Sequence, residues 1–251
     1  MKSLFKFIFC SVAASMLAMP VVISQISDDY DSIDNMIIYS HERFGQVIAH
    51  NLGFGMGYRF GKNITAFNTR FFSTELVTMR SPKQIKLLNP VPDNAKRYVY
   101  GKLNDVFILR GGFGYHRLLN SKPYWGGVEV RWNNEAGGSL AFEKPYYLFV
   151  VTTESTIKTK IFDANTSWEY IYGRAPFTKG LNEIKVVPGA FIRSSFSFEF
   201  GDIKTHLKAF EAGAMLEFFP TGVTIMFDSA DQPMFLTFYI GYSFGRRLNK
   251  Y

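Results

Sequence analysis

Long segments in which apolar and polar residues alternate at every second position constrain the fold of this chain most. In 236–245 the even positions are Leu, Phe, Ile, Tyr and Phe, and the odd positions are Thr, Tyr, Gly, Ser and Gly. Successive side chains of a β-strand point to opposite faces, so this pattern predicts a strand with one apolar and one polar face. Aromatic residues make up 17% of the chain and 21 residues are glycine. Both values favour strands over long helices.

The alternation recurs often enough to close a sheet. It is clear in 46–60, 107–116, 128–143, 190–200, 210–218 and 236–245, and weaker in 35–42 and 64–79. Several of these segments exceed the five or six residues of an ordinary soluble strand, as membrane-crossing strands do. The total of eight strands is even, as expected of bacterial single-chain barrels. The sequence therefore predicts an all-β fold, a closed antiparallel eight-stranded transmembrane β-barrel. The alternative is a secreted β-sandwich, which the strand lengths and the glycine-rich, charged polar faces disfavour.

The lengths of the connections fit the same fold. Short links are expected around 61–63, 120–124 and 201–202, and long ones at 81–104, 146–182 and 220–233, with one short outer loop at 43–45. With a periplasmic N-terminus, the short links near 61–63, 120–124 and 201–202 lie on the periplasmic side and the long ones outside, as in bacterial barrels.

The N-terminus predicts export. Lys2 and Lys6 precede and interrupt an apolar run that ends near Ser24, which is typical of a signal peptide over 1–24 rather than of a membrane anchor, the competing interpretation. A short periplasmic segment, 25–34, and the barrel, 35–251, would follow, in the bacterial outer membrane. Cys10 would leave with the signal peptide, so no disulfide is expected. The charge of +7 falls to +5 without Lys2 and Lys6, and an exported chain is not expected to bind nucleic acid.

Charged residues on the polar faces are expected to meet inside the barrel. Eight strands enclose a lumen that side chains just fill, and a charge there needs a partner. The expected lumen charge network comprises Arg59, Arg110, Glu129, Arg131, Arg193, Glu199, Glu211 and Glu217, with Glu143 as a further interior candidate. Its expected role is to fill the lumen. A proton or ion pathway is the alternative.

The two longest outer loops combine basic and aromatic residues. Such side chains suit lipopolysaccharide phosphates or a protein partner, and solvated loops with interfacial aromatics are the alternative. The candidate contacts are Lys83, Lys86, Lys96, Arg97, Lys102, Trp168, Tyr172, Arg174, Phe177 and Lys179.

Enzymatic chemistry has little support in the sequence. Four histidines are scattered without metal-ligand spacing, so neither a metal nor another cofactor is expected. Some outer-membrane barrels that modify lipid A use a histidine with a serine, for which His50 and Ser73 are the candidates. Nothing in the sequence brings the two together.

The last strand and two loop segments resemble known outer-membrane proteins. Gly241, Tyr242 and Phe244 resemble the C-terminal signal read by the barrel-assembly machinery, although residues 246–250 separate them from the final aromatic, Tyr251. Residues 100–105, which lead into Arg-Gly-Gly-Phe-Gly at 110–114, and residues 171–180 resemble a small Gram-negative outer-membrane barrel family without settled activity.

The resemblance implies a barrel without an appended soluble domain. It also implies a non-enzymatic accessory or structural subunit of a complex for barrel assembly or protein secretion. Expected partners are outer-membrane lipids, the assembly machinery and other outer-membrane proteins or lipoproteins. A lipid A-modifying enzyme and a narrow transporter are the alternatives.

Overall fold

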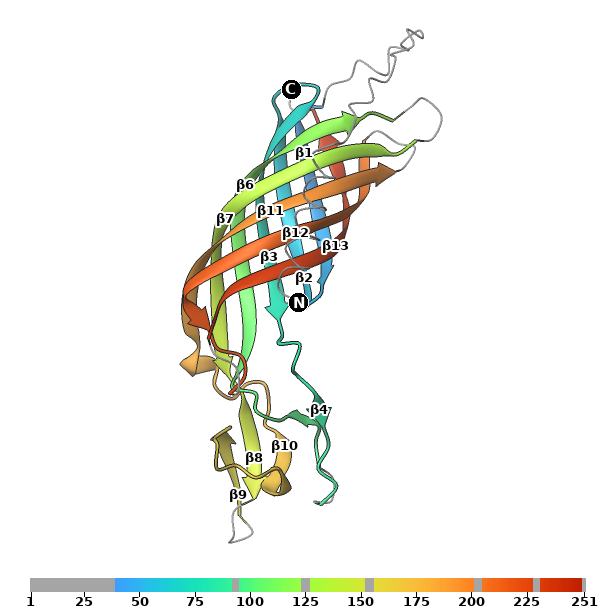
Figure 1. Cartoon of the computed structure of the whole chain (residues 1–251). Helices are drawn as coiled ribbons and strands as arrows, with labels where there is room; N and C mark the ends of the chain where they lie inside the picture. The colour runs from blue at the N-terminus through green and yellow to red at the C-terminus, as the bar shows by residue number, and fades with distance from the viewer. Residues whose placement is uncertain are drawn as a thin grey trace, which may run out of the picture. The chain divides into compact units, whose positions relative to one another are not determined.

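Eight antiparallel strands form a closed barrel in the computed structural model of the chain (Figure 1). The structure describes residues 39–91, 95–122, 127–151, 156–200, 205–227 and 231–249. The predicted signal peptide, the segment 25–34 and the start of the predicted strand 35–42 lie outside these residues. The barrel strands are β1 His41–His50, β2 Gly53–Asn63, β3 Asn68–Met79, β6 Asn104–Asn120, β7 Glu129–Pro145, β11 Lys185–Phe200, β12 His206–Val223 and β13 Gln232–Leu248.

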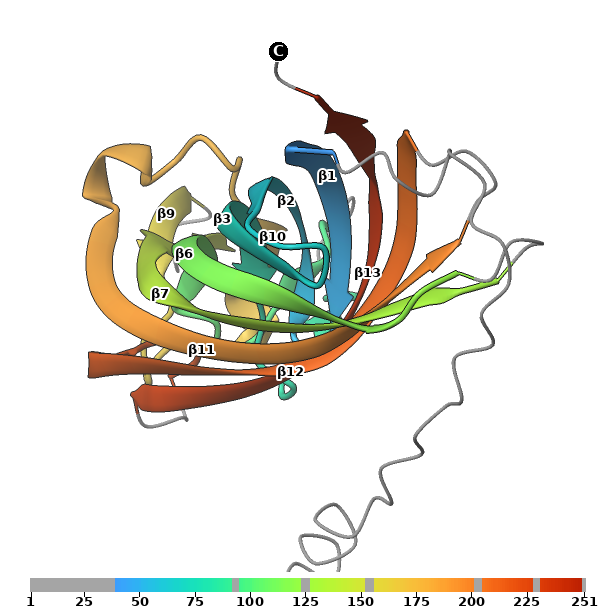
Figure 2. The same cartoon turned by 90° about the horizontal axis from the view of Figure 1, so that it is seen from above.

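The ring order is β1-β13-β12-β11-β7-β6-β3-β2, and every barrel pair is antiparallel. The first and last strands close the ring with ten paired positions, from His41 opposite Leu248 to His50 opposite Tyr239. These two strands lie side by side in Figure 2. The prediction of a closed antiparallel eight-stranded barrel is confirmed.

Alternation places charge inside and apolar side chains outside. On β11, Arg193 and Ser195 are buried in the lumen, whereas Ile192 and Phe196 are exposed on the outer wall. The predicted faces of 107–116, 190–200, 210–218 and 236–245 agree with the buried and exposed positions of β6, β11, β12 and β13.

The start of the barrel differs from the prediction. Residues 43–45 lie inside β1 and form no loop, and the predicted strand 46–60 is a hairpin that turns at Asn51 and Leu52. A two-residue turn pairs His50 with Gly53, and cross-strand partners face the same side of the sheet. The even positions of β1 therefore face the same side as the odd positions of β2. Consequently Ile48 points into the lumen, although Phe54 points outward as predicted.

The two longest connections lie at the same end of the barrel. The strand ends that flank 64–67, 121–128 and 201–205, together with the start of β1 and the end of β13, lie at what we call the terminal end. The long links at 80–103 and 146–184, the link at 224–231 and the turn at 51–52 lie at the opposite, loop end. The three predicted short links do share one end of the barrel, with the first at 64–67 rather than 61–63, and the two longest links share the other. The assignment of these ends to the periplasm and the outside stays a prediction.

The long loops fold into small sheets of their own, which we call the loop cap. It contains the pair β4 Lys86–Leu87 and β5 Tyr98–Val99, and the sheet β10-β8-β9 of Ile171–Arg174, Tyr147–Val151 and Ile157–Ile161 (Figure 1). Short 3-10 turns span Trp168–Tyr170 and Leu181–Glu183. Tyr98, Tyr146, Leu148, Phe162 and Ile171 form the apolar core of the loop cap.

Candidate functional site

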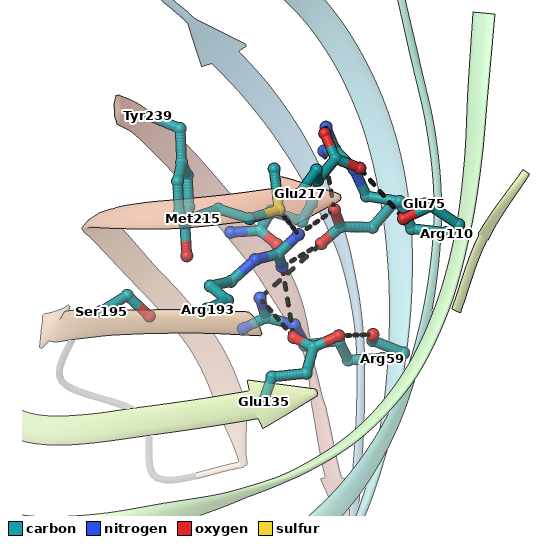
Figure 3. A network of polar contacts seen from close by, with 12 residues as sticks. Arg59, Glu75, Arg110, Glu135, Arg193, Ser195, Met215, Glu217 and Tyr239 are labelled. Carbon is teal, nitrogen blue, oxygen red and sulfur yellow. Dashed lines mark hydrogen bonds and ion pairs between the residues drawn. The ribbon is translucent and has the colours of Figure 1, made fainter. Parts of the chain in front are cut away.

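A network of three arginines and four glutamates fills the middle of the lumen, which we call the central network (Figure 3). Each side chain comes from the inward face of a strand and is almost fully buried. The members are Arg59 on β2, Glu75 on β3, Arg110 on β6, Glu135 on β7, Arg193 on β11, and Glu211 and Glu217 on β12.

The arginines bind the carboxylates mostly through paired hydrogen bonds. Arg59 donates from Nη1 and Nη2 to the two oxygens of Glu211, at 2.6 and 3.1 Å. Arg110 donates from Nε and Nη2 to Glu217, at 2.8 Å each. Arg193 binds both oxygens of Glu75 and donates from Nη1 to Oε2 of Glu135, at 3.2 Å. Such forked pairs fix geometry as well as charge, and the network links six different strands.

The network has one carboxylate more than it has arginines, and neutral side chains supply further hydrogen bonds to the carboxylates. Glu211 also accepts hydrogen bonds from Gln46 Nε2 at 3.1 Å, from Ser195 Oγ at 2.8 Å and from the Tyr239 hydroxyl. Ser139 Oγ donates to Glu217 at 3.0 Å. Because buried ions are costly unless their hydrogen bonds are satisfied, these donors explain how four carboxylates can coexist with three arginines.

A second cluster lies at the terminal end of the lumen. Glu42 accepts from Arg131 Nη1 at 3.1 Å, and Arg131 Nε also binds Glu129. Glu199 binds Arg247 and, at 3.1 Å, Lys122. A cavity of about 10 Å³ between this cluster and the central network is lined by Glu42, Arg59, His116 and Glu211 among others. That volume accommodates a single water molecule.

Apolar side chains close the lumen at the loop end. Val77, Ile108, Phe219 and Phe235 pack there with Val99 of the loop cap and with Ile225 and Met226 of the last loop. We call this cluster the apolar plug. The plug and the two charged clusters together fill the lumen with buried side chains of the described residues.

The predicted lumen residues divide between these clusters. Arg59, Arg110, Arg193, Glu211 and Glu217 belong to the central network, and Glu129, Arg131 and Glu199 to the terminal cluster. Glu143 is buried at the loop end, where it accepts from the backbone N–H of Thr224 at 2.7 Å. Sequence reasoning missed Glu42, Glu75, Glu135 and Arg247. Their inward positions on alternating strands were the available signal.

A buried amide side chain joins the two long loops. Asn89 Nδ2 lies within 3.1 Å of the carbonyl oxygens of Trp168, Glu169 and Ile171, and its Oδ1 accepts from the N–H of Val91 at 3.0 Å. Lys96 N–H also donates to the carbonyl of Tyr172 at 3.0 Å. The loop cap is therefore a folded body with fixed side-chain positions.

The candidate contacts of the outer loops are placed in two environments. Lys83, Lys86, Lys96, Arg97, Trp168, Phe177 and Lys179 are exposed, and Tyr172 is half-buried. Lys102 is buried instead, with its ammonium 2.7 Å from Asp105, and Arg174 binds the other oxygen of that carboxylate at 2.7 Å. Burial lowers the pKa of Lys102, and the charge of Asp105 opposes that shift. Lys102 and Arg174 thus anchor the loop cap to β6.

The remaining candidates show no catalytic arrangement. His50 lies at the loop-end turn, whereas Ser73 donates to Glu135 and pairs in register with Arg59. His50 pairs with Gly53, and Ser73 with Arg59, six residues further along β2. Six residues span roughly 20 Å of a strand, so His50 and Ser73 lie far apart. Gly241 faces the lumen, and Tyr242 and Phe244 face outward.

Among the described residues, no group of three or more histidine, cysteine or acidic side chains could hold a metal ion. No helix in the described part of the chain is long and apolar enough to cross a membrane. Comparison with family models, with curated proteins and with solved structures finds no match.

Proposed function

We propose that this chain is an integral protein of a bacterial outer membrane that works as a non-enzymatic accessory or structural subunit of a larger complex. The observation that carries the proposal is the inverted distribution of polarity. Arg59, Arg110 and Glu217 are at most 1% exposed in the lumen, whereas Phe113 and Ile240 are 74% and 64% exposed on the outer wall. Soluble monomers rarely expose apolar surface continuously around a sheet, but hydrocarbon tails would cover it.

The height of the apolar wall supports membrane insertion. On β13 the outward side chains from Met234 to Phe244 are apolar or aromatic. Ten residues rise about 34 Å along a strand, and at a tilt of about 45° they span roughly 24 Å. The apolar band of an outer-membrane barrel is about 25 Å tall.

Within the loop cap, the connection between β3 and β5 is the surface that we assign to a partner. Ile85, Leu88 and Val91 are each more than half exposed on the connection between β3 and β5, and Lys83 and Lys86 alternate with them. Apolar side chains beside basic ones, held on folded loops, are typical of protein interfaces. The packed lumen leaves these outer surfaces, rather than a pore, as the working parts of the protein.

Insertion can be tested by comparing unheated and heated samples in SDS gels after folding into detergent micelles or lipid vesicles. The folded barrel should migrate differently from the heated chain and should resist extraction from vesicles with alkaline carbonate. A folded, monomeric protein in buffer without detergent would refute insertion.

The assigned partner surface needs a second test. Affinity purification from detergent-solubilised membranes should recover a stable larger assembly. The variant Ile85→Glu/Leu88→Glu should lose the assembly, while the control Ile157→Glu/Ile161→Glu, on exposed β9, should keep it. If both variants recover the same amount of the assembly, the connection between β3 and β5 does not hold the complex.

A further inference from the structure

Six basic side chains face outward near the terminal end of the barrel, and we call them the basic arc. They occupy six consecutive strands of the ring, β12-β13-β1-β2-β3-β6, and all six are exposed. The members are Lys208, Arg246, Arg43, Lys62, Arg70 and Arg117. The described acidic residues at the same height, Glu42, Glu129 and Glu199, all pair inside the lumen. The outward face here is therefore purely cationic among the described residues.

Like charges stand directly opposite each other within the arc. Arg43 is the cross-strand partner of Arg246, and Lys62 is the partner of Arg70. Facing like charges destabilise a sheet. In the described part of the chain, no carboxylate lies within ion-pair distance of any arc residue, although the Arg43 guanidinium lies 5.2 Å from the centroid of the Phe60 ring. This contrasts with the lumen, where each arginine binds a carboxylate.

Aromatic rings follow the arc toward the middle of the wall. Five of the six cations have an aromatic residue two positions further into the wall, on the same face of their strand. These aromatic residues are Phe60, Phe72, Tyr115, Phe210 and Phe244. Beyond them the outward face is mainly aliphatic and aromatic. At the loop end, the last outward side chains of β2 and β3 are the uncharged Phe54 and Thr78, and a single cation, Arg80, follows β3, with its guanidinium 5.6 Å from the centroid of the Phe54 ring.

From the terminal end inward, the wall presents cations, then aromatic rings, then apolar side chains. This order matches the layers of a membrane leaflet, which are the phosphates, the interface and the acyl chains. We propose that the basic arc binds the phosphate groups of anionic phospholipids in the leaflet at the terminal end of the barrel. Phosphates between Arg43 and Arg246, and between Lys62 and Arg70, would convert two repulsive pairs into bridges. The proposal rests on the membrane insertion proposed above and names the lipid class that this end of the wall selects.

The test measures lipid selectivity by electron spin resonance. The full chain is reconstituted in phosphatidylcholine vesicles that contain spin-labelled phosphatidylglycerol or spin-labelled phosphatidylcholine, and the relative association of the two labels with the protein is compared. The arc variant is Arg43→Gln/Lys62→Gln/Arg70→Gln. The matched control, Lys158→Gln/Lys160→Gln/Lys179→Gln, removes three exposed charges from the loop cap.

The wild type and the control should prefer phosphatidylglycerol, and the arc variant should lose most of that preference. A basic residue near an anionic surface contributes about a five-fold gain in association, so three of them account for at most roughly a 100-fold loss. A wild-type preference in the arc variant would overturn the proposal, as would an equal loss in the control.

Insertion is scored separately, by the heat-dependent gel shift of the same samples. Insertion without selectivity overturns the basic arc alone. Failure of the wild type to insert overturns the proposed function as well.

Discussion

Removal of Arg110 tests whether the central network is a set of mutually dependent ions. Arg110 and Glu217 are 1% and 0% exposed and share two hydrogen bonds of 2.8 Å. The variant Arg110→Met leaves Glu217 with Ser139 as its remaining hydrogen-bond donor. An uncompensated buried charge costs about 3–5 kcal/mol of unfolding free energy.

The reverse substitution should cost less. Without the Glu217 carboxylate, Arg110 still has Glu75 at 3.7 Å, and the variant Glu217→Gln keeps an amide oxygen that can accept from Ser139. The double variant Arg110→Met/Glu217→Met removes both ions, and apolar replacement of a whole buried pair is often neutral. We therefore expect the double variant to be at least about 2 kcal/mol more stable than Arg110→Met alone.

The measurement is equilibrium urea unfolding of the vesicle-inserted protein, followed by tryptophan fluorescence. With an m-value near 3 kcal/mol per molar, the midpoint for Arg110→Met should fall by roughly 1–1.7 M. Lys185→Met is the control, because Lys185 lies 4.0 Å from Glu143 with a side chain that is 70% exposed, and such pairs contribute at most about 1 kcal/mol. If Arg110→Met costs no more than Lys185→Met, the reasoning about the central network is wrong.

Three further predictions concern other parts of the structure. Gly137→Ala should destabilise the barrel and Gly138→Ala should not. A Cβ at Gly137 would lie 2.2 Å from the carbonyl oxygen of Gly111, whereas at Gly138 the nearest atom is 3.9 Å away. Urea unfolding midpoints of the two variants check this, and equal midpoints would contradict it. Asn89→Ala removes the hydrogen bonds to three carbonyl groups and should lower the free energy of opening the loop cap by about 2–3 kcal/mol. Hydrogen exchange should then be faster in 146–174 and unchanged in β11–β13. Uniform acceleration would mean that the cap and the barrel unfold together. Planar bilayers containing the protein should show background conductance because the apolar plug and central network fill the lumen, and discrete current steps would show that the lumen opens.

The fold could be predicted from the sequence because alternation and connection length act together. A closed barrel must show polar and apolar faces on every strand, and β13 shows them over almost its whole length. The error at β1 has a physical cause. The turn at Asn51 and Leu52 lacks the usual Asn-Gly signal, and apolar residues at Ile48 and Phe54 keep the same numerical parity while facing opposite sides.

The membership of the lumen clusters could be predicted only in part. Arg193 and Glu211 follow from parity on clear strands. Glu75 was missed because adjacent Phe71 and Phe72 blur the alternation of β3, where Phe71 packs in the lumen against His116 and Phe72 faces outward. The pairing of Arg110 with Glu217 joins strands 107 residues apart in sequence, and the fold of the loop cap depends on contacts such as those of Asn89. No local pattern specifies either.

The pairing of β1 with β13 makes closure of the ring depend on one strand. Without Gln232–Leu248, β1 and β12 would each have an unsatisfied edge, and open edges invite aggregation. A copy truncated before residue 232 would therefore have a permanent seam in its wall. Whether the wall is continuous is thus decided by the pairing of a single strand.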